Sequence, residues 1–259
     1  MRFGCCTTVE GLEATRKAGF DYAELQVAAL DPEGAESEFA EVRRRIADSG
    51  LPVEAFNVFI PGVLPVVGDR VDRERLDAYL DTALARMSEV GAEIIVFGSG
   101  GARSTPDGFD RDRAADQIAM FLHLVAEKLD RVGMTLAIEP LYKTACDNIN
   151  TVPEALEMAR RVDHPRIKVL ADLFHMTYED DEFQSLSEAG ADLRHVHVPV
   201  PQLAGMPPRP WDGIYVEFLD ALQSAGYADR ISIEDNGGRF EDYSTEPKRA
   251  LEYIKGEWD

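Results

Sequence analysis

Short apolar runs alternate with amphipathic stretches along the whole chain. Each run has the character of a buried strand, because it is only four to seven residues long and almost continuously apolar. The runs cover residues 2–6, 22–27, 53–59, 93–98, 134–138, 167–171, 193–198 and 230–233. The stretches between them place apolar residues on one helical face, as in residues 76–87 and 118–129. The pattern therefore predicts strands and helices that alternate eight times.

Glycine follows many of the predicted helices. The sequences KAGF, DSGL, EVGA, RVGM, EAGA and SAGY each place a glycine between a helical stretch and the next apolar run. Glycine ends a helix easily because it adopts the left-handed conformation without a Cβ clash. The interval between Gly133 and Gly190 is long enough for two units, and Asp163-His164-Pro165 provides a further helix stop within it.

The predicted fold is an α/β protein with a single-domain (β/α)8 TIM barrel over residues 1–259. Nearly continuous apolar strands are typical of a parallel sheet that helices cover, and eight units in 259 residues match the size of this barrel. An open doubly wound sheet is the alternative. It would favour a glycine-rich phosphate turn after the first strand, and the sequence there is Gly4-Cys5-Cys6-Thr7-Thr8.

The chain is strongly acidic, with 48 Asp and Glu residues against 27 Lys and Arg and a formal net charge of -21. Such a charge disfavours nucleic acid and anionic membranes as partners. No apolar run is long enough to span a bilayer, and the first residues lack the pattern of a signal peptide. The three cysteines cannot build a disulfide framework. We therefore expect a cytoplasmic protein with no nucleic-acid or membrane partner.

Polar residues stand at the ends of the last four apolar runs. Glu139 and Asp172 follow the fifth and sixth runs, the seventh contains His195 and His197, and Glu234 follows the eighth. In a TIM barrel the carboxyl ends of the strands carry the chemistry, so these side chains are expected at one mouth. Two carboxylates about 4 Å apart repel by on the order of 4 kcal/mol at an effective dielectric near 20. They must therefore share protons or hold a cation.

The imidazole among these carboxylates favours a cation. Three carboxylates and one imidazole suit a divalent ion, with manganese as our first choice and magnesium, cobalt or zinc as alternatives. Coordination positions would remain for a substrate, which predicts a catalytic site. Because His195 and His197 alternate along one strand, we expect only one of them to face the barrel interior. Glu24, in the second run, is compatible with either the mouth or the outer surface.

Four stretches of the chain carry a family resemblance. They are Ile138-Glu139-Pro140-Leu141, Asp172-Leu173-Phe174-His175, His195-Val196-His197 and residues 213–234. Together they resemble the xylose-isomerase-like TIM barrels, specifically the sugar phosphate isomerase/epimerase group. The resemblance implies one divalent metal ion, with ligands Glu139, Asp172, His197 and Glu234. Members often form dimers or tetramers, so we expect a homo-oligomer.

The resemblance also assigns substrate contacts. His175 matches a residue that contacts a substrate hydroxyl, and Arg209 is the nearest match to an arginine that holds the substrate. Lys143, Asn57 and Trp211 are further candidates for substrate binding. The chain departs from the sugar epimerases of the group at residues 142–145, where it reads Tyr-Lys-Thr-Ala in place of Asn-Arg-Tyr-Glu. It also departs after the seventh strand, where Val-Pro-Val-Pro follows His197.

The chemistry that the resemblance implies is proton transfer beside the carbonyl of a small polyhydroxy substrate. The metal ion stabilises the enediolate oxygen, while Glu139 and Glu234 remove and return the proton. The expected function is thus a metal-dependent sugar isomerase or epimerase. A metal-dependent dehydratase of an inosose- or dehydroshikimate-like substrate is the alternative, and a non-catalytic barrel subunit a lesser one. DNA-repair endonuclease activity is disfavoured, since the acidic chain has only five histidines.

Overall fold

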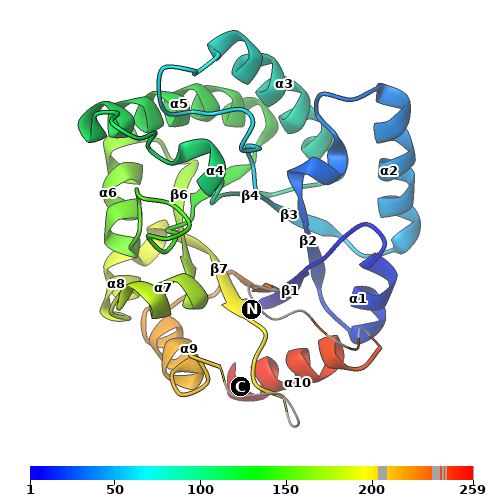
Figure 1. Cartoon of the computed structure of the whole chain (residues 1–259). Helices are drawn as coiled ribbons and strands as arrows, with labels where there is room; N and C mark the ends of the chain where they lie inside the picture. The colour runs from blue at the N-terminus through cyan, green and yellow to red at the C-terminus, as the bar shows by residue number, and fades with distance from the viewer. Residues whose placement is uncertain (204–208, 235–239, 241, 243, 259) are drawn as a thin grey trace.

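Eight parallel strands form a closed barrel in the computed structural model, which describes residues 1–203, 209–234, 240, 242 and 244–258 (Figure 1). The strands are β1 Arg2–Cys6, β2 Tyr22–Gln26, β3 Val53–Asn57, β4 Ile94–Phe97, β5 Thr135–Ile138, β6 Ile167–Asp172, β7 Leu193–Pro199 and β8 Arg230–Glu234. Each strand pairs with the next along the chain, and β1 pairs with β8. This closure confirms the TIM barrel and excludes the open sheet.

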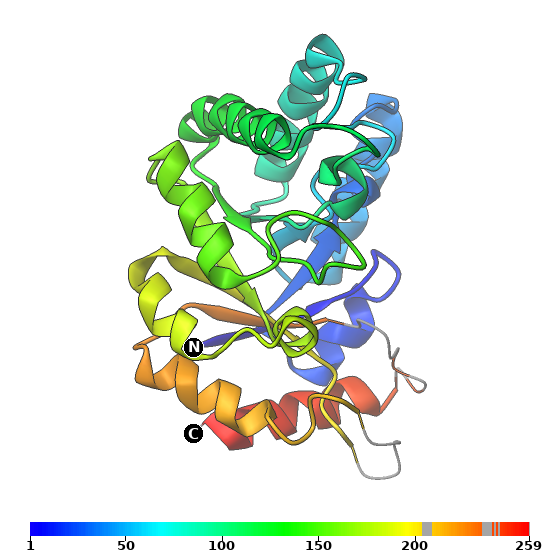
Figure 2. The same ribbon diagram turned by 60° about the vertical axis from the view of Figure 1, so that its left-hand side comes forward.

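Helices surround the barrel on the outside (Figures 1 and 2). The α-helices are α1 Leu12–Ala18, α2 Glu36–Ser49, α3 Arg73–Glu89, α4 Gly100–Arg103, α5 Arg111–Val132, α6 Val152–Val162, α7 Leu173–Glu179, α8 Gln184–Ala189, α9 Tyr215–Ser224 and α10 Glu246–Trp258. Short 3-10 helices occupy Val27–Leu30 and Gly190–Asp192. Helix α10 packs against both α9 and α1, which closes the outer ring. Within the described residues, no helix is both long and apolar enough to cross a membrane.

The predicted and observed strand boundaries differ by no more than one residue except at the end of the third run, and the glycine pattern explains the helix ends. The glycines of all six repeated sequences have positive φ angles, and Asp163 ends α6 in the left-handed conformation. The third run is shorter than predicted, because Val58 has a φ of 48° and the strand ends at Asn57. Strands β6, β7 and β8 instead extend by one residue each, so that Asp172 and Glu234 are the last residues of β6 and β8.

Alternation along the strands divides the apolar core into two layers. Ile94 and Val96 point into a small cluster inside the barrel, while Ile95 and Phe97 pack between the barrel and the helices. The inner cluster consists of Tyr22, Ala55, Ile94, Val96, Ala137 and Leu170. Because side chains alternate with a period of two, the residue two positions after an inner residue also points inward. This alternation therefore determines which polar residues at the strand ends point into the mouth of the barrel.

Candidate metal centre

Four polar side chains converge at the carboxyl ends of the last four strands. Glu139 follows β5, Asp172 ends β6, His197 lies in β7 and Glu234 ends β8. One donor atom from each lies within 4.8 Å of the others. His197 Nδ1 is central, at 3.2 Å from Glu139 Oε1, 3.1 Å from Glu234 Oε2 and 4.0 Å from Asp172 Oδ2. Glu139 and Asp172 point inward because each lies two residues after an inner apolar residue, Ala137 or Leu170.

The two carboxylate oxygens of Asp172 have separate environments. Oδ1 accepts a hydrogen bond of 2.7 Å from the main-chain N–H of Phe174 and so caps the N-terminus of α7. Oδ2 faces the cluster, 3.8 Å from His175 Nε2. The cap thus fixes the side chain with its second oxygen toward the other carboxylates.

The loop after β4 positions Glu139. A Cβ atom on Gly98 would lie 2.0 Å from Glu139 Oε2, so any side chain there would displace this carboxylate. Arg103 of α4 is completely buried, and its Nη2 donates a 2.7 Å hydrogen bond to the main-chain carbonyl of Glu139. Sequence reasoning assigned no role to Arg103, since its partners are carbonyl groups that no motif identifies.

Burial and crowding shift the ionisation of the cluster. Burial raises the pKa of Asp172 well above its ordinary value, and the charges of Glu234 and Glu139 raise it further. Burial also opposes ionisation of Glu139, but the hydrogen bond and charge of His197 hold its pKa below the ordinary value. A divalent cation would offset the repulsion among the three carboxylates. The donor set of three carboxylates and one imidazole therefore fits such an ion.

Glu24 and both histidines of β7 lie beneath the cluster, and all three are fully buried. The expectation that only one histidine faces inward was wrong, since residues two apart on a strand share a face. Glu24 Oε1 accepts a hydrogen bond of 2.9 Å from His197 Nε2, and Oε2 accepts one of 2.8 Å from His195 Nε2. Glu24 therefore points into the barrel. Its position two residues after the inner Tyr22 is the signal that could have placed it there.

A cavity of about 220 Å³ adjoins the cluster and includes two of the predicted substrate contacts. Glu139, Glu234, His175 and Asn57 line it together with glycines and apolar residues of the neighbouring loops. His175 Nδ1 accepts a 3.2 Å hydrogen bond from the N–H of Tyr142, whose ring stacks on the imidazole. Asn57 Oδ1 is buried and has no hydrogen-bond partner among the described residues.

The other three predicted substrate contacts do not line this cavity in the described part of the chain. Lys143 is exposed, with its Nζ 2.8 Å from a carboxylate oxygen of Glu179. Trp211 is buried, donates to the carbonyl of Val200 and packs against Phe174 at 5.5 Å between ring centres. Arg209 also donates to the carbonyl of Val200, and its guanidinium lies over the Trp211 ring. These contacts give Trp211 a packing role in the loop after β7.

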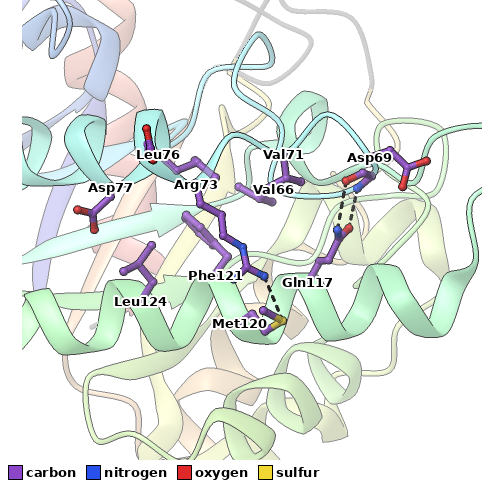
Figure 3. A pocket seen from close by; sticks show the side chains of 12 residues that line it. Val66, Asp69, Val71, Arg73, Leu76, Asp77, Gln117, Met120, Phe121 and Leu124 are labelled. Atoms are coloured by element: carbon purple, nitrogen blue, oxygen red, sulfur yellow. Dashed lines mark hydrogen bonds between the residues drawn. The ribbon is translucent and has the colours of Figure 1, made fainter.

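A larger cavity, of about 600 Å³, lies outside the barrel between α3 and α5 (Figure 3). Its walls combine apolar side chains, such as Phe121 and Leu124 of α5, with the charged Asp69, Arg73, Glu74 and Asp77. Arg73 reaches across it toward Met120, with 3.9 Å between Nη2 and Sδ. None of the candidate metal ligands lines this cavity, so the predicted chemistry belongs to the smaller one.

Residues 12–256 match the family model described as xylose isomerase-like TIM barrel, and the chain belongs to this family. The family expected from the sequence motifs is thus confirmed. The chain is 29% identical over 252 residues to an L-ribulose 3-epimerase of Mesorhizobium japonicum, with 93% of this chain and 79% of that protein covered. It is 25% identical over 201 residues to a 3-dehydro-D-guloside 4-epimerase of Escherichia coli, with 73% of each covered.

A solved structure shares the fold over its whole length. It is a D-psicose 3-epimerase with D-tagatose from Clostridium cellulolyticum, which matches with a TM-score of 0.81 at 20% identity and 100% coverage of each chain. At 20% sequence identity, this structural similarity shows only that the two proteins share the barrel fold.

Proposed function

We propose that this chain is a divalent-metal-dependent epimerase or isomerase of a sugar or a related polyhydroxy ketone. One observation carries the proposal: four donor groups from four successive strands lie within 4.8 Å of one another, beside a cavity. The epimerase names of the relatives from Mesorhizobium japonicum and Escherichia coli support the reaction class. Those names differ in the carbon that is inverted, so the proposal extends to the class and leaves the carbon open.

Glu139 and Glu234 are proposed as the proton-transferring pair. Both line the cavity, and they extend from β5 and β8, which are separated by β6 and β7. One carboxylate would remove the proton beside the substrate carbonyl, and the other would return a proton to the opposite face. When bound, a divalent ion would polarise that carbonyl and stabilise the charge that develops on its oxygen. Glu139, Asp172, His197 and Glu234 would hold the ion.

His175 and Asn57 are proposed to orient the substrate. The other ring nitrogen of His175, Nε2, lies 3.8 Å from Asp172 Oδ2, beyond hydrogen-bond distance, and in a residue that lines the cavity it can bind a substrate hydroxyl. The buried Oδ1 of Asn57 can accept a hydrogen bond from a second hydroxyl, which would satisfy an otherwise costly unpaired acceptor. A polyhydroxy substrate matches these two groups.

Solvent deuterium uptake tests the reaction. Purified protein with Mn²⁺ would be incubated in D₂O with D-psicose, D-fructose and L-ribulose, and the products analysed by NMR and mass spectrometry. We expect deuterium at a carbon next to the carbonyl, and we expect Glu139→Gln and Glu234→Gln to abolish the uptake. An enone that absorbs in the near ultraviolet, formed from an inosose or dehydroshikimate, would instead support the dehydratase. If the protein catalysed neither deuterium exchange nor enone formation, the proposed function would be contradicted.

The identity of the metal ion, the oligomeric state and the cellular location are further parts of the proposal. Manganese is our first choice because the donor set is rich in oxygen and includes one imidazole. Elemental analysis of the purified protein tests this choice against magnesium, cobalt and zinc. A homo-oligomer and a cytoplasmic location are predictions from the sequence, which light scattering and cell fractionation can test.

A further inference from the structure

Glu24 is a fully buried carboxylate that lies outside the proposed ligand set. Glu24 lies in β2, whereas His197 lies in β7. Its Oε1 lies 2.9 Å from His197 Nε2, on the side of the ring away from the carboxylates of Glu139 and Glu234. The imidazole of His197 thus bridges Glu24 and the candidate metal centre.

This arrangement determines which ring nitrogen of His197 carries a proton. An ionised carboxylate only accepts hydrogen bonds, so Nε2 must donate to Glu24. A metal ion needs the lone pair of the other nitrogen, Nδ1, which faces the carboxylate cluster. The contact with Glu24 therefore selects the tautomer that can bind a cation, and it also fixes the rotation of the ring.

Glu24 is itself held by groups from two other positions in the barrel. Its Oε2 accepts hydrogen bonds of 2.7 Å from Ser232 Oγ in β8 and 2.8 Å from His195 Nε2 in β7. The hydroxyl of Tyr22 lies 2.8 Å from Ser232 Oγ and extends the network. All of these residues are fully buried, so the carboxylate has little freedom to rotate.

We propose that Glu24 is a positioning residue that fixes the tautomer and orientation of His197 for metal binding, and that Ser232 and His195 hold Glu24 in place. The inference rests on the proposed function, because it assumes that a divalent ion binds at His197. Loss of such an outer partner typically lowers metal affinity about 10- to 100-fold.

The test compares Mn²⁺ affinity in two variants that each neutralise one buried carboxylate. The carboxylate of Glu24 can only accept a hydrogen bond, whereas the amide in Glu24→Gln can also donate one to Nε2. The variant therefore permits the tautomer with the proton on Nδ1, which cannot bind a metal ion there. Glu54→Gln is the matched control: Glu54 lies in the neighbouring strand β3 and pairs with Arg2 and Arg230, away from His197. We expect Glu24→Gln to bind Mn²⁺ about 10- to 100-fold more weakly and Glu54→Gln to bind like the wild type.

Nitrogen-15 NMR of His197 in the Mg²⁺-loaded protein gives a readout that general destabilisation would not produce. We expect a proton on Nε2 in both proteins, shifted further downfield in the wild type, because the carboxylate of Glu24 is a stronger acceptor than the amide of Glu24→Gln. Should Glu24→Gln fail to fold, Ser232→Ala replaces it, with an expected loss of affinity in the same direction. Wild-type affinity in the folded variant would overturn the inference.

Two ligand variants separate failure of this inference from failure of the proposed function. If Glu139→Gln and His197→Ala lose Mn²⁺ binding while Glu24→Gln retains it, only the role of Glu24 is wrong. If the wild type itself binds no divalent ion, both the proposed function and the role of Glu24 are overturned.

Discussion

The carboxylate of Glu139 occupies the space that a side chain on Gly98 would fill, with 2.0 Å between Oε2 and the position of a Cβ atom. Gly98 has no positive φ, so alanine is compatible with its backbone, and the close contacts of the added Cβ are with Glu139, while Leu141 Cδ2 at 3.6 Å is in ordinary van der Waals contact. We expect Gly98→Ala to lower the rate of deuterium uptake about 100-fold, because a displacement of about 1 Å in a catalytic group has that effect.

Gly213→Ala is the control for this change, since a Cβ atom there would meet no atom within 4 Å. It should retain the wild-type rate. Equal rates for Gly98→Ala and the wild type would show that the reaction does not depend on the position that Glu139 has in this structure.

Asp172 combines a helix cap with a candidate ligand, and two substitutions separate these roles. Asp172→Asn keeps an oxygen for the N–H of Phe174 but loses the charge, whereas Asp172→Ala loses both. We expect both variants to bind Mn²⁺ more than about tenfold more weakly. Only Asp172→Ala should also lower the free energy of unfolding of the metal-free protein, by about 1 kcal/mol. Titration calorimetry and urea unfolding measure the two effects, and unchanged affinity in Asp172→Asn would remove this residue from the ligand set.

Arg103 is expected to support the site through the main chain. Its guanidinium donates to the carbonyls of Phe97, Glu139 and Ile149, and a lysine has no planar fork with which to contact all three. Arg103→Lys should lower the free energy of unfolding by about 1–3 kcal/mol, because buried acceptors remain unpaired.

The control for this variant is Arg111→Lys, at an exposed residue that pairs with Asp147. Its free energy of unfolding should stay within about 0.5 kcal/mol of the wild type in urea titrations. A similarly small effect of Arg103→Lys would mean that water or other groups satisfy the three carbonyls.

Asn57 and Lys143 are both predicted substrate contacts, and the structure places them differently. Asn57 lines the cavity and its Oδ1 has no hydrogen-bond partner within the described part of the chain, while Lys143 is exposed and paired with Glu179. Asn57→Ala should lower kcat/KM roughly two- to twelve-fold, the equivalent of one hydrogen bond of about 0.5–1.5 kcal/mol. Lys143→Met should leave kcat/KM within about twofold of the wild type, since an exposed pair contributes little. Steady-state kinetics with the substrate that the deuterium assay identifies would measure both values. A lower kcat/KM for Lys143→Met than for Asn57→Ala would contradict these two assignments.

The sequence predicted the barrel and its four convergent donor groups because both depend on local patterns. Apolar runs define the strands, and a polar residue at the end of each late strand lies at the mouth of any such barrel, as Glu139 does. The same period of two also places Glu24 and His195 inside, so the prediction of a single inward-facing histidine was wrong. Arg103 was unpredictable for a physical reason. Its partners are main-chain carbonyls brought together only by the folded loops.

Metal removal provides the most direct link between the donor cluster and stability. A ligand that binds only the folded state stabilises it by RT ln(1 + [L]/Kd), or about 2.7 kcal/mol at a hundred times Kd. We expect the wild type to gain this amount when Mn²⁺ is added after treatment with a chelator, as measured by urea unfolding. The gain should fall in acid, because carboxylates and imidazole bind metal only when deprotonated. His197→Ala removes the donor atom at the centre of the cluster and should lose most of the gain. An undiminished gain in this variant would place the ion elsewhere on the acidic surface.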